Sequence, residues 1–162
     1  KNKGAVYFQA PEQKIAEFQE GDFVCKQMTE PEMLKKFWQV ALNYQQFVTF
    51  NGRAFDAPFL IIRSAASKIK PSVNLMPYRY GDNLHIDLLD QLTFYGAVRR
   101  RGNLHLWTRA FGIKSPKAQG VSGHEIASLF KAGKFIDIAR YSAGDVIAAK
   151  ELYEFWRDYV KK

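Results

Sequence analysis

Apolar residues recur along the chain with two different periods. Near the start, short apolar stretches alternate with turn residues, which predicts strands at Ala5–Gln9, Lys14–Phe18 and Phe23–Met28. Gln19–Asp22 is expected to form the hairpin loop between the last two of these strands. From Thr29 onward, apolar residues recur three and four positions apart, which is the spacing of one face of a helix.

The first predicted helix carries a recognisable starting signal. Thr29 can cap the helix, Glu32 follows three residues later and completes a capping box, and Pro31 is tolerated in the first turn. The apolar face that we expect this helix to bury is formed by Met33, Leu34, Phe37, Trp38, Ala41 and Leu42.

Strand and helix signals alternate in the rest of the chain. Gln46–Phe50 is typical of a short strand that ends at Asn51–Gly52, and a second helix is expected to run from Asp56 to about Lys68. After a connection rich in Pro, Gly and Asn, His85–Leu89 is either a strand end or a helix start. Further helices are predicted at Asn103–Phe111, Ser122–Ala132 and Phe135–Lys161.

This order of elements indicates a single α/β domain with a mixed β-sheet over residues 1–162. Hydrophobic residues make up 47% of the chain, which is enough for one folded core. The longest apolar runs, such as Phe59–Ile62, are too short to span a bilayer. The single cysteine, Cys25, leaves no internal disulfide and no cysteine-based zinc site, so a reducing compartment, most simply the cytoplasm, is expected.

The formal charge of +8 is distributed unevenly along the chain. Residues 1–60 hold seven basic and seven acidic residues, whereas residues 61–162 hold 17 basic and nine acidic residues. A basic half of this kind is typical of a protein with a polyanionic partner, and nucleic acid is favoured over an anionic membrane surface. The alternative is a basic domain whose charge serves only solubility.

The first segment that carries chemistry is Phe47–Leu60. A strand ends, a turn follows, and the carboxylate of Asp56 lies at the start of the next helix, at the edge where α/β proteins tend to bind ligands. The alternative role for Asp56 is that of a simple helix cap.

The second such segment lies inside the last predicted helix. Tyr141 and Asp145 are four residues apart, so their side chains leave the same face of the helix and can address one site. In that arrangement the acid can hold a metal while the hydroxyl orients a water. The alternative is an amphipathic helix in which Tyr141 packs and Asp145 faces solvent.

Together these two segments resemble a known enzyme family. NGRAFDAPFL, at residues 51–60, is similar to the second motif of the DEDD-type 3′–5′ exonucleases, and the Tyr-x-x-x-Asp at 141–145 is similar to the third motif of their tyrosine subclass. HIDLLDQL, FGIKSPK and VSGHEIASLF also resemble the branch related to the proofreading domain of family-B DNA polymerases. The resemblance covers the chain from about Thr29 to its end.

The resemblance implies a ribonuclease H-like fold, with a mixed sheet flanked by helices. It also implies hydrolysis of terminal phosphodiester bonds at the 3′ ends of single-stranded DNA or RNA, with two divalent ions, Mg²⁺ or Mn²⁺. Asp56 and Asp145 would be metal ligands, and Tyr141 would position the attacking water. Asn51 and Phe55, which flank Asp56, are expected to approach the terminal nucleotide.

One part of the family pattern is missing. The first motif, Asp-x-Glu at the end of the first strand, does not occur in these 162 residues. Its two acids normally bind both metals, so this chain holds half of the ligand set and is expected to have little or no nuclease activity. We therefore expect an N-terminally incomplete piece of a nuclease domain; the alternative is that Ala5–Gln9 is a degenerate first strand.

Basic residues on or beside predicted loops are candidates for contacts with phosphates. They are Arg99, Arg100, Arg101, Arg109, Lys114 and Lys117. Two alternative functions stay open beside the nuclease: a non-catalytic module that binds nucleic acid on a degenerate exonuclease fold, and a scaffold that binds protein.

Overall fold

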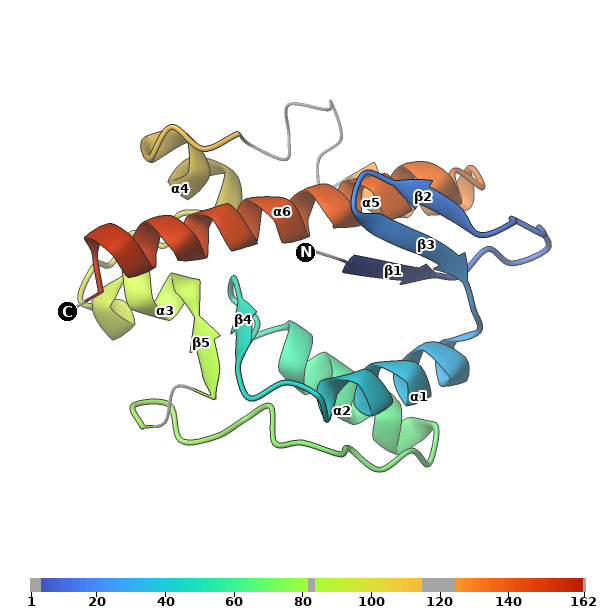
Figure 1. The fold of residues 1–162 in the computed structure, drawn as a ribbon, viewed down its shortest axis with the longest axis horizontal. Helices are drawn as coiled ribbons and strands as arrows, with labels where there is room; N and C mark the ends of the chain where they lie inside the picture. The colour runs from blue at the N-terminus through green and yellow to red at the C-terminus, as the bar shows by residue number, and fades with distance from the viewer. Residues whose placement is uncertain (1–3, 82–83, 115–124, 162) are drawn as a thin grey trace.

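The strands form two small sheets in the computed structural model, which describes residues 4–81, 84–114 and 125–161 (Figure 1). In the first sheet, β1 (Gly4–Phe8) is parallel to the central strand β3 (Phe23–Gln27), and β2 (Phe18–Glu20) is antiparallel to it. The second sheet is a parallel pair, β4 (Phe47–Thr49) and β5 (His85–Asp87). The expected mixed sheet is thus present in two parts, with strand order β1-β3-β2 and β4-β5.

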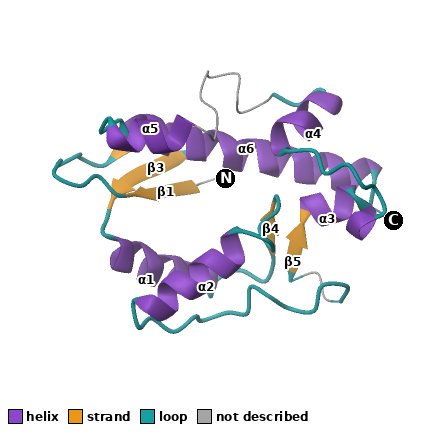
Figure 2. Cartoon of the chain, turned by 180° about the vertical axis from the view of Figure 1, so that it is seen from behind, coloured by secondary structure: helices purple, strands orange, loops and turns teal. Residues whose placement is uncertain are grey.

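Helices lie on both sides of the second sheet, whereas the described helices cover one face of the first sheet and leave its other face, with Val24, exposed. The long helix α6 (Phe135–Tyr159) runs along one side and contacts β1 and β4, so it bridges the two sheets (Figure 1). On the opposite side, α1 (Glu30–Ala41) packs against α2 (Asp56–Ala66) (Figure 2). The shorter elements are α3 (Leu88–Leu92), the 3₁₀ turn η1 (Phe94–Gly96), α4 (Leu104–Ala110) and α5 (Ile126–Lys131).

The two halves of α6 are buried in different apolar clusters. Its first half packs on the first sheet through Phe135, Ala139 and Ala143. Its second half packs against β5 and α3 through Leu152 and Trp156. One continuous helix is therefore buried at both ends, which fixes the position of the residues midway along it.

A third cluster holds α1 against α2. Trp38 and Ala41 of α1 pack there with Ala57 of α2. The Trp38 indole N–H donates a hydrogen bond to the hydroxyl of Ser64, at 2.8 Å, so the one polar atom of this buried ring is satisfied.

Most predicted helices are confirmed within one to three residues. The backbone N–H of Thr29 donates to the Glu32 carboxylate at 2.8 Å, as the capping box requires, and α1 begins at the next residue. The predicted start of the fifth helix, Ser122, lies outside the described residues, and the described part of that helix is Ile126–Lys131.

The predicted second strand and hairpin loop are wrong. Lys14–Glu17 form no strand, whereas Gln19 and Glu20, expected in the loop, pair with β3 and leave a two-residue turn at Gly21 and Asp22. The cause is a side chain on β3. Gln27 accepts a hydrogen bond from the N–H of Ile15 at 2.7 Å and donates to the carbonyls of Ala10 and Gln13. These bonds satisfy backbone groups that would otherwise need a strand partner.

In the part of the chain that the structure describes, none of the helices has the length and apolar character needed to cross a bilayer.

Candidate active site

The carboxylates of Asp56 and Asp145 line the same pocket. Asp56 is the first residue of α2, and Asp145 lies midway along α6. The pocket has a volume of about 580 Å³, and its wall includes Phe55 and the β4 residues Val48 and Thr49. Two carboxylates from distant parts of the sequence therefore meet at the end of β4.

Tyr141 lies one helical turn before Asp145, within reach of a hydrogen bond to it. Partial burial, followed by the negative charge of Asp145, raises the pKa of Tyr141 above its ordinary value. The phenol is therefore protonated at neutral pH, so it can donate to the Asp145 carboxylate and still accept a hydrogen bond from water through its oxygen.

The electrostatics of the pocket favour a cation. Burial raises the pKa of Asp145, the hydrogen bond from Tyr141 lowers it, and the nearby charge of Asp56 raises it again. Burial likewise raises the pKa of Asp56, opposed by a backbone hydrogen bond and reinforced by the charge of Asp87. A positive ion between these groups would relieve both the desolvation and the repulsion.

The turn that presents Asp56 is held by a buried carboxylate from β5. Asp87 is only 3% exposed and accepts hydrogen bonds from the backbone N–H groups of Asn51, at 2.7 Å, and Arg53, at 2.9 Å. It also accepts one from Leu89 at 3.0 Å, which makes it the N-cap of α3. Asp87 thus fixes the start of the next helix and the turn before Asp56 with one side chain.

Two residues of this turn have conformations that few side chains allow. Asn51 has φ +62°, a left-handed conformation that asparagine adopts more readily than most residues. A Cβ atom on Gly52 would overlap the side chain of Thr49, so only glycine fits at this position. The NG dipeptide is therefore a structural requirement of the turn.

His85 holds the end of β4 from the neighbouring strand. One ring nitrogen, Nδ1, donates to the carbonyl of Leu75 at 2.7 Å, because a carbonyl can only accept. The other, Nε2, is 2.8 Å from the hydroxyl of Thr49. His85 is thus a buried structural residue that positions β4.

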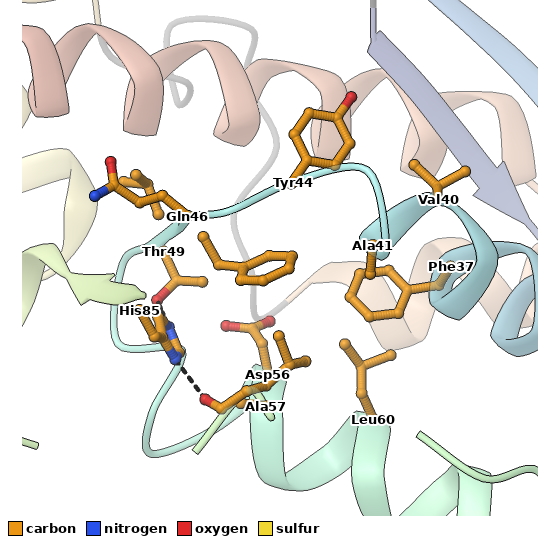
Figure 3. A pocket seen from close by; sticks show the side chains of 13 residues that line it. Phe37, Val40, Ala41, Tyr44, Gln46, Thr49, Asp56, Ala57, Leu60 and His85 are labelled. Carbon is orange, nitrogen blue, oxygen red and sulfur yellow. Dashed lines mark hydrogen bonds between the residues drawn. The ribbon is translucent and has the colours of Figure 1, made fainter. Parts of the chain in front are cut away.

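Asp56 also borders a second, mostly apolar pocket of about 390 Å³ between α1 and β4 (Figure 3). Phe37, Ala41 and Leu60 form part of its wall, and the Asp56 carboxylate lies toward the side of Thr49 and His85 (Figure 3). Asp56 therefore stands where the two pockets meet, which agrees with the desolvation that raises its pKa.

The structure brings some of the predicted site residues together and leaves others apart. Phe55 lines the carboxylate pocket, is exposed, and stacks on Phe59, with ring centroids 6.0 Å apart. Asp56 is not the helix cap, because that position is occupied by Phe55. Asn51 lies in the turn and is not part of the pocket wall.

The predicted phosphate contacts do not line this pocket. Arg99, Arg100 and Arg101 are exposed in the connection between η1 and α4, and Lys114 is exposed after α4. Lys117 lies outside the described residues.

Lys150 and Tyr153 line the pocket but were not predicted to belong to it. Tyr153 is eight residues after Asp145, so extending the four-residue spacing of Tyr141 and Asp145 by two turns would have found it; Lys150, five residues after Asp145, is not on that row. The bonds from Asp87 to the turn had no signal in the sequence, since they depend on the pairing of β4 with β5.

The two carboxylates are the type of ligand that a hard divalent cation prefers, but they are too few to hold one by themselves. Carboxylate oxygens are the ligands that Mg²⁺ and Mn²⁺ prefer. Among the described residues, however, no three His, Cys, Asp or Glu side chains lie close enough together to hold a metal ion. Asp56 and Asp145 are therefore at most part of a complete ligand set.

Comparison with known proteins agrees with the geometry. Residues 9–156 match the family model of predicted 3′–5′ exonucleases related to the exonuclease domain of PolB. The chain is 31% identical over 147 residues to a DNA polymerase of Pyrococcus glycovorans and 30% identical to DNA polymerase 1 of Pyrococcus abyssi. These alignments cover 81% of this chain and 18% of each polymerase, so the chain spans less than a fifth of the length of these relatives.

Proposed function

Because this chain belongs to the family of 3′–5′ exonucleases related to the exonuclease domain of PolB, we propose that its carboxylate pocket binds the 3′ end of a single-stranded nucleic acid for hydrolysis. The observation that carries the proposal is that Asp56 and Asp145 line one pocket, with Tyr141 one helical turn from Asp145 and within reach of a hydrogen bond to it. The substrate is DNA or RNA, since both carry the phosphodiester on which such a site acts.

Each of the three residues has a separate task in this proposal. Asp56 and Asp145 are metal ligands, because their charges repel one another in a partly dehydrated site. Tyr141 holds the attacking water: its hydroxyl can donate to Asp145 while its oxygen accepts a hydrogen bond from that water. Bound Mg²⁺ or Mn²⁺ would stabilise the charge that develops on the phosphate oxygens.

Contacts with the substrate follow from the position of the aromatic and basic groups. The stacked and exposed pair Phe55–Phe59 lies beside Asp56 and offers a face for the terminal base. Asn51 is held by Asp87 in the turn before Asp56, and we expect it to approach the same base from outside the pocket wall. Arg99, Arg100, Arg101 and Lys114 would neutralise phosphates farther along the strand.

Full activity needs ligands beyond those two carboxylates. These 162 residues contain no Asp-x-Glu, and two carboxylates where four are expected hold Mg²⁺ weakly. We therefore expect the 162-residue chain alone to bind Mn²⁺ weakly and to hydrolyse little or nothing.

Metal binding by this chain provides the first test. Titration with MnCl₂ should raise the melting temperature of the wild type, and Asp145→Asn should reduce that rise. Asp158→Asn, which alters an exposed carboxylate paired with Arg157, is the matched control and should respond as the wild type does. Equal responses of the wild type and Asp145→Asn would contradict the assignment of the ligands.

Hydrolysis provides the second test, with single-stranded DNA labelled at its 5′ end so that removal of 3′ nucleotides gives a ladder. The wild-type chain should give almost no ladder with Mn²⁺. In a form that also supplies the Asp-x-Glu ligands, Asp145→Asn should abolish the ladder. Tyr141→Phe should slow it while leaving Mn²⁺ binding unchanged. If the form that supplies the Asp-x-Glu ligands stays active when it carries Asp145→Asn, the proposed site is contradicted.

A second candidate function is a non-catalytic module that binds nucleic acid. It is favoured by the excess of basic residues in residues 61–162 together with the missing acids. Fluorescence anisotropy with labelled single-stranded DNA in EDTA should show affinity that falls as salt rises. Affinity independent of salt would contradict this function.

A further inference from the structure

A cluster of exposed tyrosines lies outside the carboxylate pocket. We call Tyr78, Tyr80 and Tyr95 the tyrosine cluster. The Tyr80 ring is central, with its centroid 5.8 Å from that of Tyr78 and 5.0 Å from that of Tyr95. The three residues are 74%, 59% and 40% exposed, and none of them lines the pocket of Asp56 and Asp145. Exposed aromatic rings that gather in this way indicate a binding surface.

The backbone that carries the first two tyrosines is anchored on both sides. The guanidinium of Arg53 donates to the carbonyl of Pro77 at 2.6 Å. Arg79, between the two tyrosines, forms an ion pair with Asp90 of α3 and donates to it through two nitrogens. The rings are therefore held outward on a fixed segment, and little ordering entropy is lost when a ligand binds.

The third tyrosine is presented by a strained turn. Phe94 and Tyr95 have φ values of +49° and +55°, a left-handed conformation that costs about 1–3 kcal/mol for a bulky residue. The turn persists because the N–H groups of Gly96 and Val98 both donate to the carbonyl of Thr93, each at 3.0 Å. The side chain of Gln91 also donates to the Tyr95 hydroxyl at 2.8 Å.

Three arginines continue the same segment. Arg99, Arg100 and Arg101 follow the strained turn directly, and all three are exposed. None of them forms an ion pair with another described residue, unlike Arg79. Arginines without an ion pair among the described residues, next in sequence to exposed aromatic rings that meet edge-on or tilted, suit a ligand with both flat bases and phosphates.

We propose that the tyrosine cluster and Arg99–Arg101 form a stacking platform for single-stranded nucleic acid, separate from the carboxylate pocket. Bases stack on the three rings, and the arginines contact the phosphates of the same strand. A proline-rich peptide is the other ligand that exposed tyrosines commonly bind, but it does not account for three arginines that form no ion pair with any described residue. The proposal needs nucleic acid as the ligand, as the proposed function does, but it needs neither metal nor hydrolysis.

The test is the affinity of the 162-residue chain for a labelled 20-nucleotide single-stranded DNA, measured by anisotropy in EDTA. Tyr80→Leu removes the central ring and should weaken binding at least about fivefold. Tyr80→Phe keeps the ring and should bind as the wild type does. Tyr159→Leu is the matched control, because Tyr159 is 77% exposed at the end of α6 and makes its ring contact with Phe155. Its affinity should stay within about twofold of the wild type.

The arginines give a second, independent readout. Replacing all three by alanine should reduce the slope of log affinity against log salt by about 2, since each phosphate contact on a single strand contributes about 0.7. Circular dichroism checks that each variant is folded.

Three results would overturn the platform. They are wild-type affinity in Tyr80→Leu, equal weakening by Tyr80→Phe and Tyr80→Leu, or tighter binding of a proline-rich peptide than of the DNA. Because EDTA removes the metals, any of these results would leave the proposed hydrolysis at the carboxylate pocket untouched. Conversely, loss of Mn²⁺ binding at that pocket would leave the platform standing.

Discussion

The two carboxylates of the pocket are positioned by different kinds of structure. Asp56 follows a turn whose backbone N–H groups bond to Asp87, a buried side chain on another strand. Asp145 is carried by the middle of a 25-residue helix that is buried at both ends. One carboxylate thus depends on a few polar bonds and the other on many apolar contacts. We expect that removing one polar group will destabilise the turn strongly, whereas changes in side-chain volume will destabilise the helix in proportion to their size.

The largest expected effect comes from Asp87→Asn. The amide group has nearly the same shape as the carboxylate, but it carries no charge, and its NH₂ would face a backbone N–H donor. A buried donor would lose its partner, so the free energy of unfolding should fall by about 3 kcal/mol. Urea unfolding would measure the change.

Hydrogen exchange can show whether this loss is local to the turn. In Asp87→Asn the amides of Asn51 and Arg53 should exchange faster, while the buried amides in the middle of α6 should be affected less. A uniform increase over the whole chain would mean that the turn and the helix are not separate units.

The helix should respond to a change of volume. Ala139 is fully buried against the first sheet, so Ala139→Leu overfills that cluster and should lower the free energy of unfolding by about 1–3 kcal/mol. Ala65→Leu adds the same atoms at an exposed position of α2 and should change stability by less than about 0.5 kcal/mol. If Ala139→Leu and Ala65→Leu both have the melting temperature of the wild type, packing against the first sheet does not hold α6 in place.

The smallest expected effect concerns the charge of Asp145. In the folded protein the pKa of Asp145 is raised above its ordinary value of 3.8, so the unfolded chain loses this proton more readily. Ionisation of Asp145 therefore lowers the free energy of unfolding as the pH rises above 3.8. Asp145→Asn should therefore be more stable than the wild type at pH 7, and the difference should shrink on acidification toward pH 4. Urea unfolding at both values would measure it.

Asp158→Asn is a control of opposite sign. The hydrogen bond from Arg157 lowers the pKa of Asp158, so its ionised form contributes stability above the ordinary value and loses it on acidification. Removing that charge should not stabilise the protein at pH 7. If Asp145→Asn and Asp158→Asn both raised the free energy of unfolding at pH 7, the proposed difference between the pocket carboxylate and the surface carboxylate would be wrong.

Local sequence patterns predicted most of the elements. The capping box at Thr29 and Glu32, the apolar spacing of α1 and the long final helix are signals within a few residues, and each is found in the structure. The prediction failed at Lys14–Phe18, where the backbone bonds to a side chain on β3. No pattern in residues 14–18 themselves indicates that partner.

The sequence by itself determined which residues can carry chemistry and which helix or turn presents each of them. The NG turn before Asp56 and the four-residue spacing of Tyr141 and Asp145 are local features, set by backbone geometry. Only the tertiary structure decided that Asp56 and Asp145 share a pocket and that Asp87 holds the turn. Both outcomes depend on the register of β4 with β5, which places Thr49 opposite Asp87, and on the packing of α6 across both sheets. Such contacts join residues far apart in the chain, so no local pattern encodes them.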